Sequence, residues 1–231
     1  LGAPAAVAVS VSCYGLIVAM DDDLRMDGLI ELHRGLERQG PSDAALSLQI
    51  LAELPKLPPT RRVLDLGCGT GSSALLLAEH FETMVTAVDL AQPFLDEMMQ
   101  RAQPRSLADR IHPLACDFAE LPIESGSVDL PWSEAAAYNL TFAGALDAWR
   151  PLLKPSAVAV ISELTWLSDD IPDRPRTYWE QAYPAIADES ENIARAQAAG
   201  FDVKRTYHLP TQAWWDNYYN PLLDRIANLS H

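Results

Sequence analysis

A glycine-rich segment is the part of this sequence with the clearest capacity for chemistry. Gly67, Gly69 and Gly71 alternate with other residues directly after the apolar run 62–66 and directly before a helical pattern. Glycine lets the backbone approach a ligand closely, and the N-terminus of the following helix offers unpaired N–H groups. In open α/β folds, ligands bind at strand-to-helix turns of this kind. The segment therefore predicts a ligand site.

The acid that precedes this loop, Asp65, indicates which class of ligand belongs there. A carboxylate in this position repels a pyrophosphate, whereas it suits an ammonium or a sulfonium group. The spacing also departs from the dinucleotide fingerprint G-x-G-x-x-G, because Ser72 stands at its last position. Residues 63–81 contain no Lys or Arg, which excludes a Walker-type phosphate cradle. A partly cationic ligand without phosphate fits best.

The elements that must position this loop alternate between strands and helices. Such alternation indicates an α/β fold with a mainly parallel sheet covered on both faces. Right-handed crossovers then give a Rossmann-like three-layer sandwich. The predicted strands are 62–66, 84–89, 111–116, 128–132, 157–163 and 201–209. The predicted helices are 27–38, a helix capped by Ser42 or Asp43 that runs to Leu51, and then 72–81, 93–102, 142–153, 190–199 and 211–229.

Five elements, in order and spacing, resemble the class I S-adenosylmethionine (SAM) dependent methyltransferases. The glycine loop resembles the first motif of that family, and Asp89 stands where the family has an acid that accepts hydrogen bonds from the ribose hydroxyls. Asp117-Phe118 resembles the element that lies beside the adenine in this family. Trp132-Ser133-Glu134 resembles the segment that faces the methyl group, and residues 152–155 resemble the turn before the fifth strand. The resemblance implies SAM as the cofactor. The residues it implies for cofactor binding are Asp65, Gly67, Cys68, Gly69, Gly71, Asp89, Leu90, Asp117, Phe118, Ser133 and Arg38.

A closer resemblance is to a subgroup of uncharacterised bacterial small-molecule methyltransferases. It is carried by Arg38-Gln39-Gly40-Pro41, by Trp132-Ser133-Glu134 with Ala137-Tyr138-Asn139, and by Tyr183-Pro184. The resemblance implies functional roles for Arg38 and Gln39, and it does not fix a substrate. Cys68 is expected to be a small packing residue of the loop and not a nucleophile.

Candidate catalytic residues follow the fourth predicted strand, at the carboxyl end of the sheet. Methyl transfer from a sulfonium is an in-line displacement that depends on alignment and dehydration more than on acid or base catalysis. Glu134, Tyr138 and Asn139 are the candidates, with Glu134 as general base. Ser133 alternatively caps a helix, and His33 is either a lid residue or an ordinary surface residue. An aromatic-rich insertion near 165–184 either roofs the substrate pocket or forms an ordinary core or dimer contact.

Composition narrows the class of partner. The 231 residues include 32 acidic and 17 basic side chains, for a formal net charge of −15. This acidity disfavours binding to nucleic acids and to anionic membranes, because both need clustered Lys and Arg. Three widely spaced cysteines predict neither a disulfide framework nor a metal site and favour a reducing cytoplasm. We therefore expect a small-molecule substrate, no metal, no nucleic acid, no membrane, and a monomer or homodimer.

The expected domain organisation leaves one question about the sheet. Residues 1–20 carry no charge and form an N-terminal arm or an extension, which is vector-derived or mis-called, a packing arm, or an export or membrane signal. Residues 21–60 form a helical lid, and residues 61–231 form the methyltransferase domain. Pro131 removes a backbone donor from the predicted strand 128–132. Six strands are expected, so the family's seventh is missing here, and either it follows His231 or another segment such as the arm fills its position.

The leading hypothesis is SAM-dependent methyl transfer to a small-molecule acceptor. Two alternatives stay open. One is a SAM-binding protein without catalysis, which Pro131 and the short C-terminus motivate. The other is a nucleotide-dependent oxidoreductase on a related fold, which binding of NADH but not SAM would favour.

Overall fold

The predicted strands form one parallel sheet. The computed structural model describes residues 5–11 and 22–229, and neighbouring strands of its sheet run parallel to one another. From edge to edge the strands are β4 (Ile111–Ala115), β3 (Val85–Asp89), β2 (Val63–Leu66), β5 (Leu130–Ser133), β6 (Val158–Trp166), β1 (Ala5–Val11) and β8 (Asp202–His208). A short strand, β7 (Ala187–Asp188), pairs with the end of β6. The predicted Rossmann-like α/β class is confirmed.

A segment near the N-terminus occupies a position inside the sheet. β1 pairs with β6, from Ala5 opposite Val158 to Val11 opposite Leu164, and it pairs with β8 on its other side. A strand with a neighbour on each side favours uncharged residues, whereas the charged residues of β8 suit the edge of the sheet. The position left open by the sequence is therefore filled from the N-terminal arm. Residues 1–4 and 12–20 of that arm lie outside the described residues.

The helices form where the sequence predicts them, with small differences. α1 ends at His33 instead of Arg38, because Gly35 adopts a φ of +79° and turns the chain. Asp43 caps α2 by accepting a hydrogen bond from the N–H of Leu46 at 2.7 Å. The helices are α1 (Asp22–His33), α2 (Ala44–Glu53), α3 (Ser72–Phe81), α4 (Gln92–Ala102), α5 (Phe142–Trp149), α6 (Asp173–Ala182) within the predicted insertion, α7 (Glu189–Ala198), α8 (Thr211–Trp214), a π-helical turn (Trp215–Tyr219) and α9 (Asn220–Leu229). Within the described ranges, none of them is both long enough and apolar enough to cross a bilayer.

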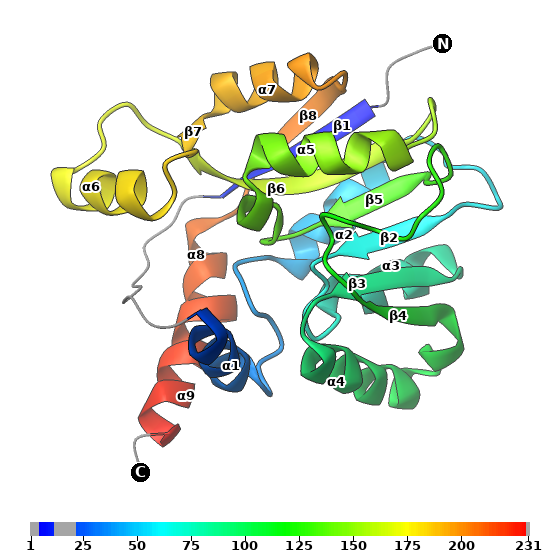
Figure 1. Cartoon of the computed structure of the whole chain (residues 1–231), viewed down its shortest axis with the longest axis horizontal. Helices are drawn as coiled ribbons and strands as arrows, with labels where there is room; N and C mark the ends of the chain where they lie inside the picture. The colour runs from blue at the N-terminus through cyan, green and yellow to red at the C-terminus, as the bar shows by residue number, and fades with distance from the viewer. Residues whose placement is uncertain (1–4, 12–21, 230–231) are drawn as a thin grey trace.

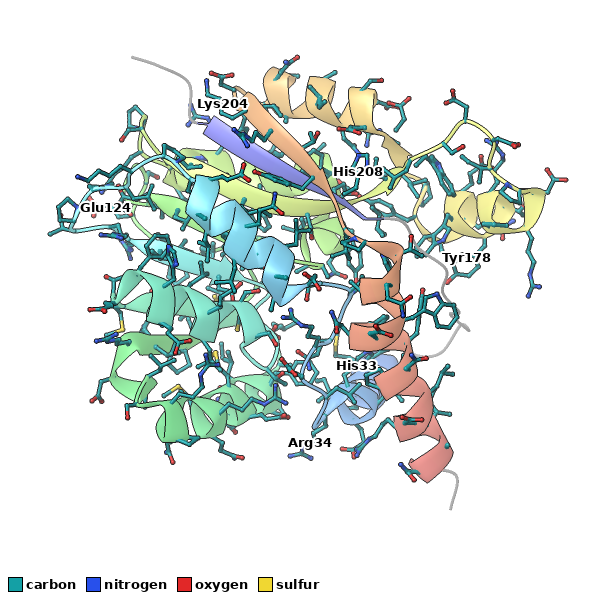
Figure 2. The ribbon with its side chains drawn as sticks, turned by 180° about the vertical axis from the view of Figure 1, so that it is seen from behind. His33, Arg34, Glu124, Tyr178, Lys204 and His208 are labelled. Carbon is teal, nitrogen blue, oxygen red and sulfur yellow. The ribbon has the colours of Figure 1, made fainter. Side chains whose placement is uncertain are left out.

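Two apolar cores cover opposite faces of the sheet. Helices α2, α3 and α4 contribute to one core, and α5 and α7 contribute to the other (Figure 1). Figure 2, seen from behind, shows α2 lying across the first of these faces. Successive residues of β6 divide between the cores, since Val160 belongs to the first and Ile161 to the second. Helices α1 and α9 contact each other beside the sheet (Figure 1).

Pro131 is accommodated in β5 at the point where pairing with β6 begins. The N–H of Leu130 donates to the carbonyl of Arg62, on the β2 side, so strand alternation turns the nitrogen of Pro131 toward β6. Pairing with β6 starts only at Trp132, opposite Val160. The strand therefore lacks one donor on that side while it stays paired with β2 on the other.

The pairing of β1 can be tested by removing one backbone donor. Val7→Pro takes an N–H from a strand that lies between two partners, so we expect the free energy of unfolding to fall by roughly 2–4 kcal/mol in urea denaturation. Val7→Thr keeps the N–H and the β-branched side chain and serves as the control. Equal stability of the two variants would show that this segment does not pair within the sheet.

Candidate functional site

The glycine loop joins β2 to α3 and is fixed by backbone hydrogen bonds. The N–H groups of Gly67 and Cys68 both donate to the carbonyl of Val88 at 2.9 Å, and the N–H of Gly71 donates to the carbonyl of Cys68. These bonds tie the loop to the end of β3, its neighbour in the sheet. The thiol of Cys68 is buried, and burial raises its pKa well above the usual range. Cys68 therefore packs in the loop, as its predicted lack of reactivity requires.

Each predicted glycine of the loop meets a different neighbour. Gly67, Gly69 and Gly71 have φ values of +77°, +52° and +89°, a region that side chains rarely adopt. A Cβ at Gly67 would lie 2.2 Å from the Cβ of Ala136, and one at Gly69 would lie 2.2 Å from Oε1 of Gln39. At Gly71 the obstacle is Met98, whose Cγ would be 2.3 Å away. The loop is therefore closed in by the segment after β5, by the chain before α2 and by α4.

Asp65 is a buried acid directly under this loop. Its side chain belongs to a residue only 1% exposed, and among the described residues its Oδ2 has no hydrogen-bond partner. Burial raises the pKa of Asp65 well above its usual range, and the negative charges of Glu134 and Asp89 raise it further. A buried acceptor without a partner is costly. An ammonium group bound at the loop would relieve that cost.

Asp89 stands at the end of β3 and already supports the loop. Its Oδ2 accepts from the N–H of Gly69 at 2.8 Å, and its Oδ1 accepts from the N–H of Ala91 at 2.9 Å. Burial raises the pKa of Asp89, while these two backbone donors oppose that shift. The next residue, Leu90, is 61% exposed. Asp89 thus fixes the loop and retains acceptor capacity for a further donor.

The other predicted cofactor residues have different partners. The Asp117 side chain is exposed and accepts from the N–H of Ala119 at 2.8 Å. Phe118 lies within 3.5 Å of the Cβ position at Gly67 and packs edge-on against Trp149. Ser133 is fully buried, and its hydroxyl donates to the carbonyl of Leu66 at 2.9 Å, so it joins β5 to β2 instead of capping a helix.

Residues 34–43, which we term the strap, join α1 to α2 and lie against the loop. The Oε1 of Gln39 accepts from the N–H of Thr70 at 2.8 Å, and its Nε2 donates to the hydroxyl of Thr70 at 3.1 Å. Arg38 donates to the hydroxyl of Ser42 and lies 3.9 Å from Oε2 of Glu134. The strap therefore brings Gln39 to the loop and Arg38 to Glu134.

Glu134, the candidate general base, is held by β5 and by α2. Its Oε1 accepts from Nε1 of Trp132 at 2.7 Å and from the hydroxyl of Ser47 at 2.8 Å. Ser47, on α2, is a contact that carried no signal in the sequence beyond a polar residue on an apolar helix. A cavity with room for about one water molecule lies beside Glu134 and is also lined by Ser42, Ser47 and Ser162.

The structure does not bring the three candidate catalytic residues together. Glu134 turns toward α2 and the strap, whereas Tyr138 packs edge-on against Tyr183, which follows α6, with ring centroids 6.4 Å apart. Asn139 lies in the short helix η3 (Ala137–Leu140) and donates from Nδ2 to the carbonyl of Ala136 at 3.0 Å. Tyr138, 37% exposed, and Asn139 both face outward, whereas Glu134 is half-buried.

His33 joins α1 to the C-terminal helices. The residue is buried, its Nδ1 lies 2.8 Å from the carbonyl of Leu29, and its ring stacks on Tyr218 at a centroid distance of 5.9 Å. Burial lowers the pKa of His33. These contacts give His33 a structural role where α1 meets the π-helical turn.

Glu163, on β6, is a buried acid that the sequence did not single out. The residue is 3% exposed, and within residues 5–11 and 22–229 neither of its carboxyl oxygens finds a partner in hydrogen-bonding geometry. Burial raises the pKa of Glu163 to about 7, although the Tyr183 hydroxyl and the charge of Arg195 act in the opposite direction. The hydroxyl of Tyr183 accepts from the N–H of Phe142 at 3.1 Å, and its own pKa is raised by burial. No periodicity or motif distinguishes such an acid from an exposed one.

Comparison with known proteins supports the predicted family. The pattern of the family described as methyltransferase domain matches residues 63–156, from β2 to the turn before β6. Residues 63–156 therefore match a methyltransferase domain, which supports the resemblance to the class I SAM-dependent methyltransferases. Among relatives, malonyl-[acyl-carrier protein] O-methyltransferase of Methylovorus sp. is 35% identical over 120 residues, which cover 48% of this chain and 39% of that protein. Trans-aconitate 2-methyltransferase of Escherichia coli is 27% identical over 204 residues, covering 83% and 71%.

The methyltransferase fold extends over most of the chain. The solved structure of YJHP from E. coli matches with a TM-score of 0.73 and 19% identity, over 87% of this chain and 82% of that one. In contrast, this chain spans less than half the length of the first curated relatives that it matches. The structural similarity at this identity establishes the fold alone.

The residues of the loop fit the cofactor of this family, SAM. SAM carries an ammonium group and a sulfonium, and Asp65 offers a buried, unpartnered carboxyl oxygen among the described residues. Asp89 has acceptor capacity for ribose hydroxyls, and the positive φ values of the loop bring its backbone close to whatever binds there. The described residues contain no cluster of three or more His, Cys, Asp or Glu side chains suited to a metal ion.

The close approach at Gly67 generates a prediction. Gly67→Ala places a methyl group against Ala136 at a positive φ, so we expect a loss of roughly 2–4 kcal/mol in the free energy of unfolding. Gly126→Ala is the matched control, because Gly126 has a φ of +65° but no described atom lies within 4 Å of its Cβ position. It should cost only about 1–2 kcal/mol in backbone strain. Equal losses for both variants would mean that Ala136 does not pack on the loop.

The raised pKa of Glu163 generates a second prediction. In the folded protein its pKa is about 7 and its ordinary value is 4.5, so the unfolded state loses this proton first as the pH rises. The wild type should therefore lose stability relative to Glu163→Gln between about pH 4.5 and 7, by roughly 1–3 kcal/mol in total, as urea denaturation across pH would measure. Glu124→Gln, an exposed substitution, is the control. A difference between wild type and Glu163→Gln that does not change with pH would contradict this account.

Proposed function

We propose that this protein transfers the methyl group of SAM to a small-molecule acceptor. The observation that carries the proposal is the buried Oδ2 of Asp65, which lacks a partner among the described residues at the carboxyl end of β2. A site at the carboxyl end of a strand with an unpartnered carboxyl group selects a ligand that carries a cationic group. SAM has such a group, and the loop has no basic residue that would favour a phosphorylated ligand instead.

The residues around the loop take distinct roles in binding. Asp65 accepts from the ammonium end of the cofactor, and Asp89 accepts from the ribose hydroxyls while it continues to hold the N–H of Gly69. Leu90, Asp117 and Phe118 border the adenine end. Arg38, a strap residue beside Glu134, is the partner for the carboxylate of the cofactor.

Catalysis rests on alignment and exclusion of water. When bound, SAM supplies a methyl group activated by the positive sulfonium. The chain aligns the acceptor with that methyl group in a site that the strap closes, and such alignment and dehydration contribute most of the acceleration. Glu134, oriented by Trp132 and Ser47, is the proton acceptor if the acceptor atom carries a proton. Tyr138 and Asn139 border the acceptor on the side of η3.

A small molecule is the acceptor class that fits the chain best. The formal net charge of −15 disfavours RNA and DNA, and the relatives named above act on an acyl-carrier-linked malonyl group and on trans-aconitate. We place the protein in the cytoplasm on the strength of its cysteine usage alone. The oligomeric state stays open between monomer and homodimer.

Calorimetric titration of the protein with SAM and S-adenosylhomocysteine tests the proposal. We expect binding of both, and Asp89→Ala should weaken it by roughly 1–3 kcal/mol because ribose hydrogen bonds and the support of Gly69 are lost. Asp96→Ala is the control, since Asp96 is an exposed acid on α4 that pairs with Gln92. A wild-type protein that binds NADH and neither SAM nor S-adenosylhomocysteine would overturn the proposal.

A further inference from the structure

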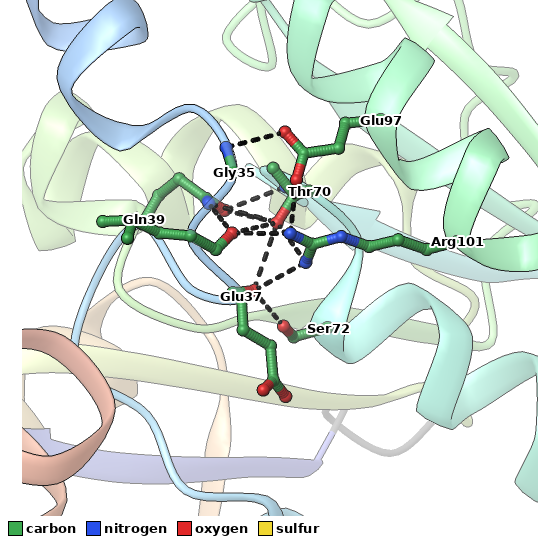
Figure 3. A network of polar contacts seen from close by, with 8 residues as sticks. Gly35, Glu37, Gln39, Thr70, Ser72, Glu97 and Arg101 are labelled. Carbon is green, nitrogen blue, oxygen red and sulfur yellow. Dashed lines mark hydrogen bonds and ion pairs between the residues drawn. The ribbon is translucent and has the colours of Figure 1, made fainter. Parts of the chain in front are cut away.

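Arg101 on α4 reaches two separate segments of the site (Figure 3). Its guanidinium donates to the hydroxyl of Thr70 in the glycine loop at 2.8 Å. The same group donates to the carbonyl of Leu36 at 2.8 Å and to the carbonyl of Glu37 at 3.2 Å, both in the strap. One cation therefore holds backbone oxygens of the strap and a side chain of the loop at the same time.

A second residue, one turn earlier on α4, completes the attachment. Glu97 forms an ion pair with Arg101 and accepts from the N–H of Gly35 at 3.0 Å through its other oxygen. The Arg101 and Glu97 side chains are only 26% and 18% exposed. The pair is thus partly shielded from solvent, and hydrogen bonds that involve charged groups are the stronger kind.

Thr70 is the point where these contacts meet. Its hydroxyl lies between Arg101, the strap carbonyls of Leu36 and Glu37, and the side chain of Gln39 (Figure 3). The N–H of Thr70 donates to Oε1 of Gln39. The N–H of Gly69, the residue before it, donates to Oδ2 of Asp89. A shift of the strap would therefore take away the partner of the Thr70 N–H, which follows directly after the N–H that Asp89 holds.

A neighbouring ion pair, between Arg105 and Glu79, is more exposed to solvent and serves as a comparison. Arg105 pairs with Glu79 at 2.6 Å, and their side chains are 42% and 60% exposed. This pair touches neither the loop nor the strap in any contact of the described residues. Exposed pairs of this kind contribute little to stability. Arg105 therefore matches Arg101 in charge and location without sharing its contacts.

We propose that Arg101 is a positioning residue of the cofactor site, which latches the strap onto the glycine loop from α4. The inference rests on the proposed function, because it assigns a purpose to a closed loop that binds SAM. Arg101 does not touch the reacting atoms. It acts through Thr70 and the strap backbone, which in turn hold Gln39 against Gly69 and keep Arg38 beside Glu134.

The first test compares Arg101→Ala with Arg105→Ala by calorimetry and proteolysis. Arg101→Ala should bind S-adenosylhomocysteine at least about tenfold more weakly than wild type, and Arg105→Ala should stay within about twofold. Without ligand, trypsin should cut after Arg38 faster in Arg101→Ala, because the Arg38 side chain is only 10% exposed while the latch is closed. Unchanged affinity and unchanged cutting in a folded Arg101→Ala protein would overturn the proposal.

A second variant distinguishes the attachment of the strap by Arg101 from an effect on overall stability and from the proposed function. Arg101→Lys keeps one charged donor and should recover part of the lost affinity and part of the protection of Arg38. If Arg101→Ala fails to fold, Glu97→Gln, which weakens the same attachment, should still speed cutting after Arg38, and no change would overturn the latch. A wild type that binds no SAM would defeat the proposed function, whereas the proteolysis compares the strap without any ligand.

Discussion

The close packing around the β2–α3 loop is the constraint on which the rest of the site depends. Three residues with positive φ let three separate parts of the chain approach within van der Waals contact: Ala136 after β5, Gln39 in the strap and Met98 on α4. Any side chain at these positions would force those parts away. The strap, the segment that carries Glu134 and the helix that carries Arg101 are therefore held around one short stretch of backbone.

That packing also creates an electrostatic cost at the centre of the site. Asp65 is buried beneath the loop, near two other acids, and burial with their charges raises its pKa. Two backbone N–H groups offset the free-energy cost of burying the Asp89 carboxylate. The Oδ2 of Asp65 has no such donor among the described residues. A cationic group at the loop would neutralise the charge of Asp65. A binding role therefore explains why the chain keeps a buried acid that destabilises its folded state.

The sequence predicted local structure well and long-range pairing poorly. The helix 72–81 has the predicted bounds, and its glycine loop follows the predicted strand, because turn residues and periodicity act over a few residues. The pairing of β1 between β6 and β8 was only one alternative, since an uncharged segment does not specify its partners. The sequence gives no signal for the role of Arg101, because a basic residue near the end of an amphipathic helix is common. Its strap partners are backbone carbonyls, which no sequence pattern indicates. The orientation of Glu134 toward Ser47 depends likewise on tertiary packing.

The central claim is that Asp65 is a receptor for a positive charge on the cofactor. Its most direct test compares the affinity of the wild-type protein for S-adenosylhomocysteine with that for the same molecule lacking its amino group. A charge-assisted contact in a buried site predicts that the intact ligand binds at least about tenfold more tightly, and that Asp65→Asn reduces this preference. Equal affinities for the two ligands would contradict the assignment of Asp65, and with it the physical basis of the proposed function.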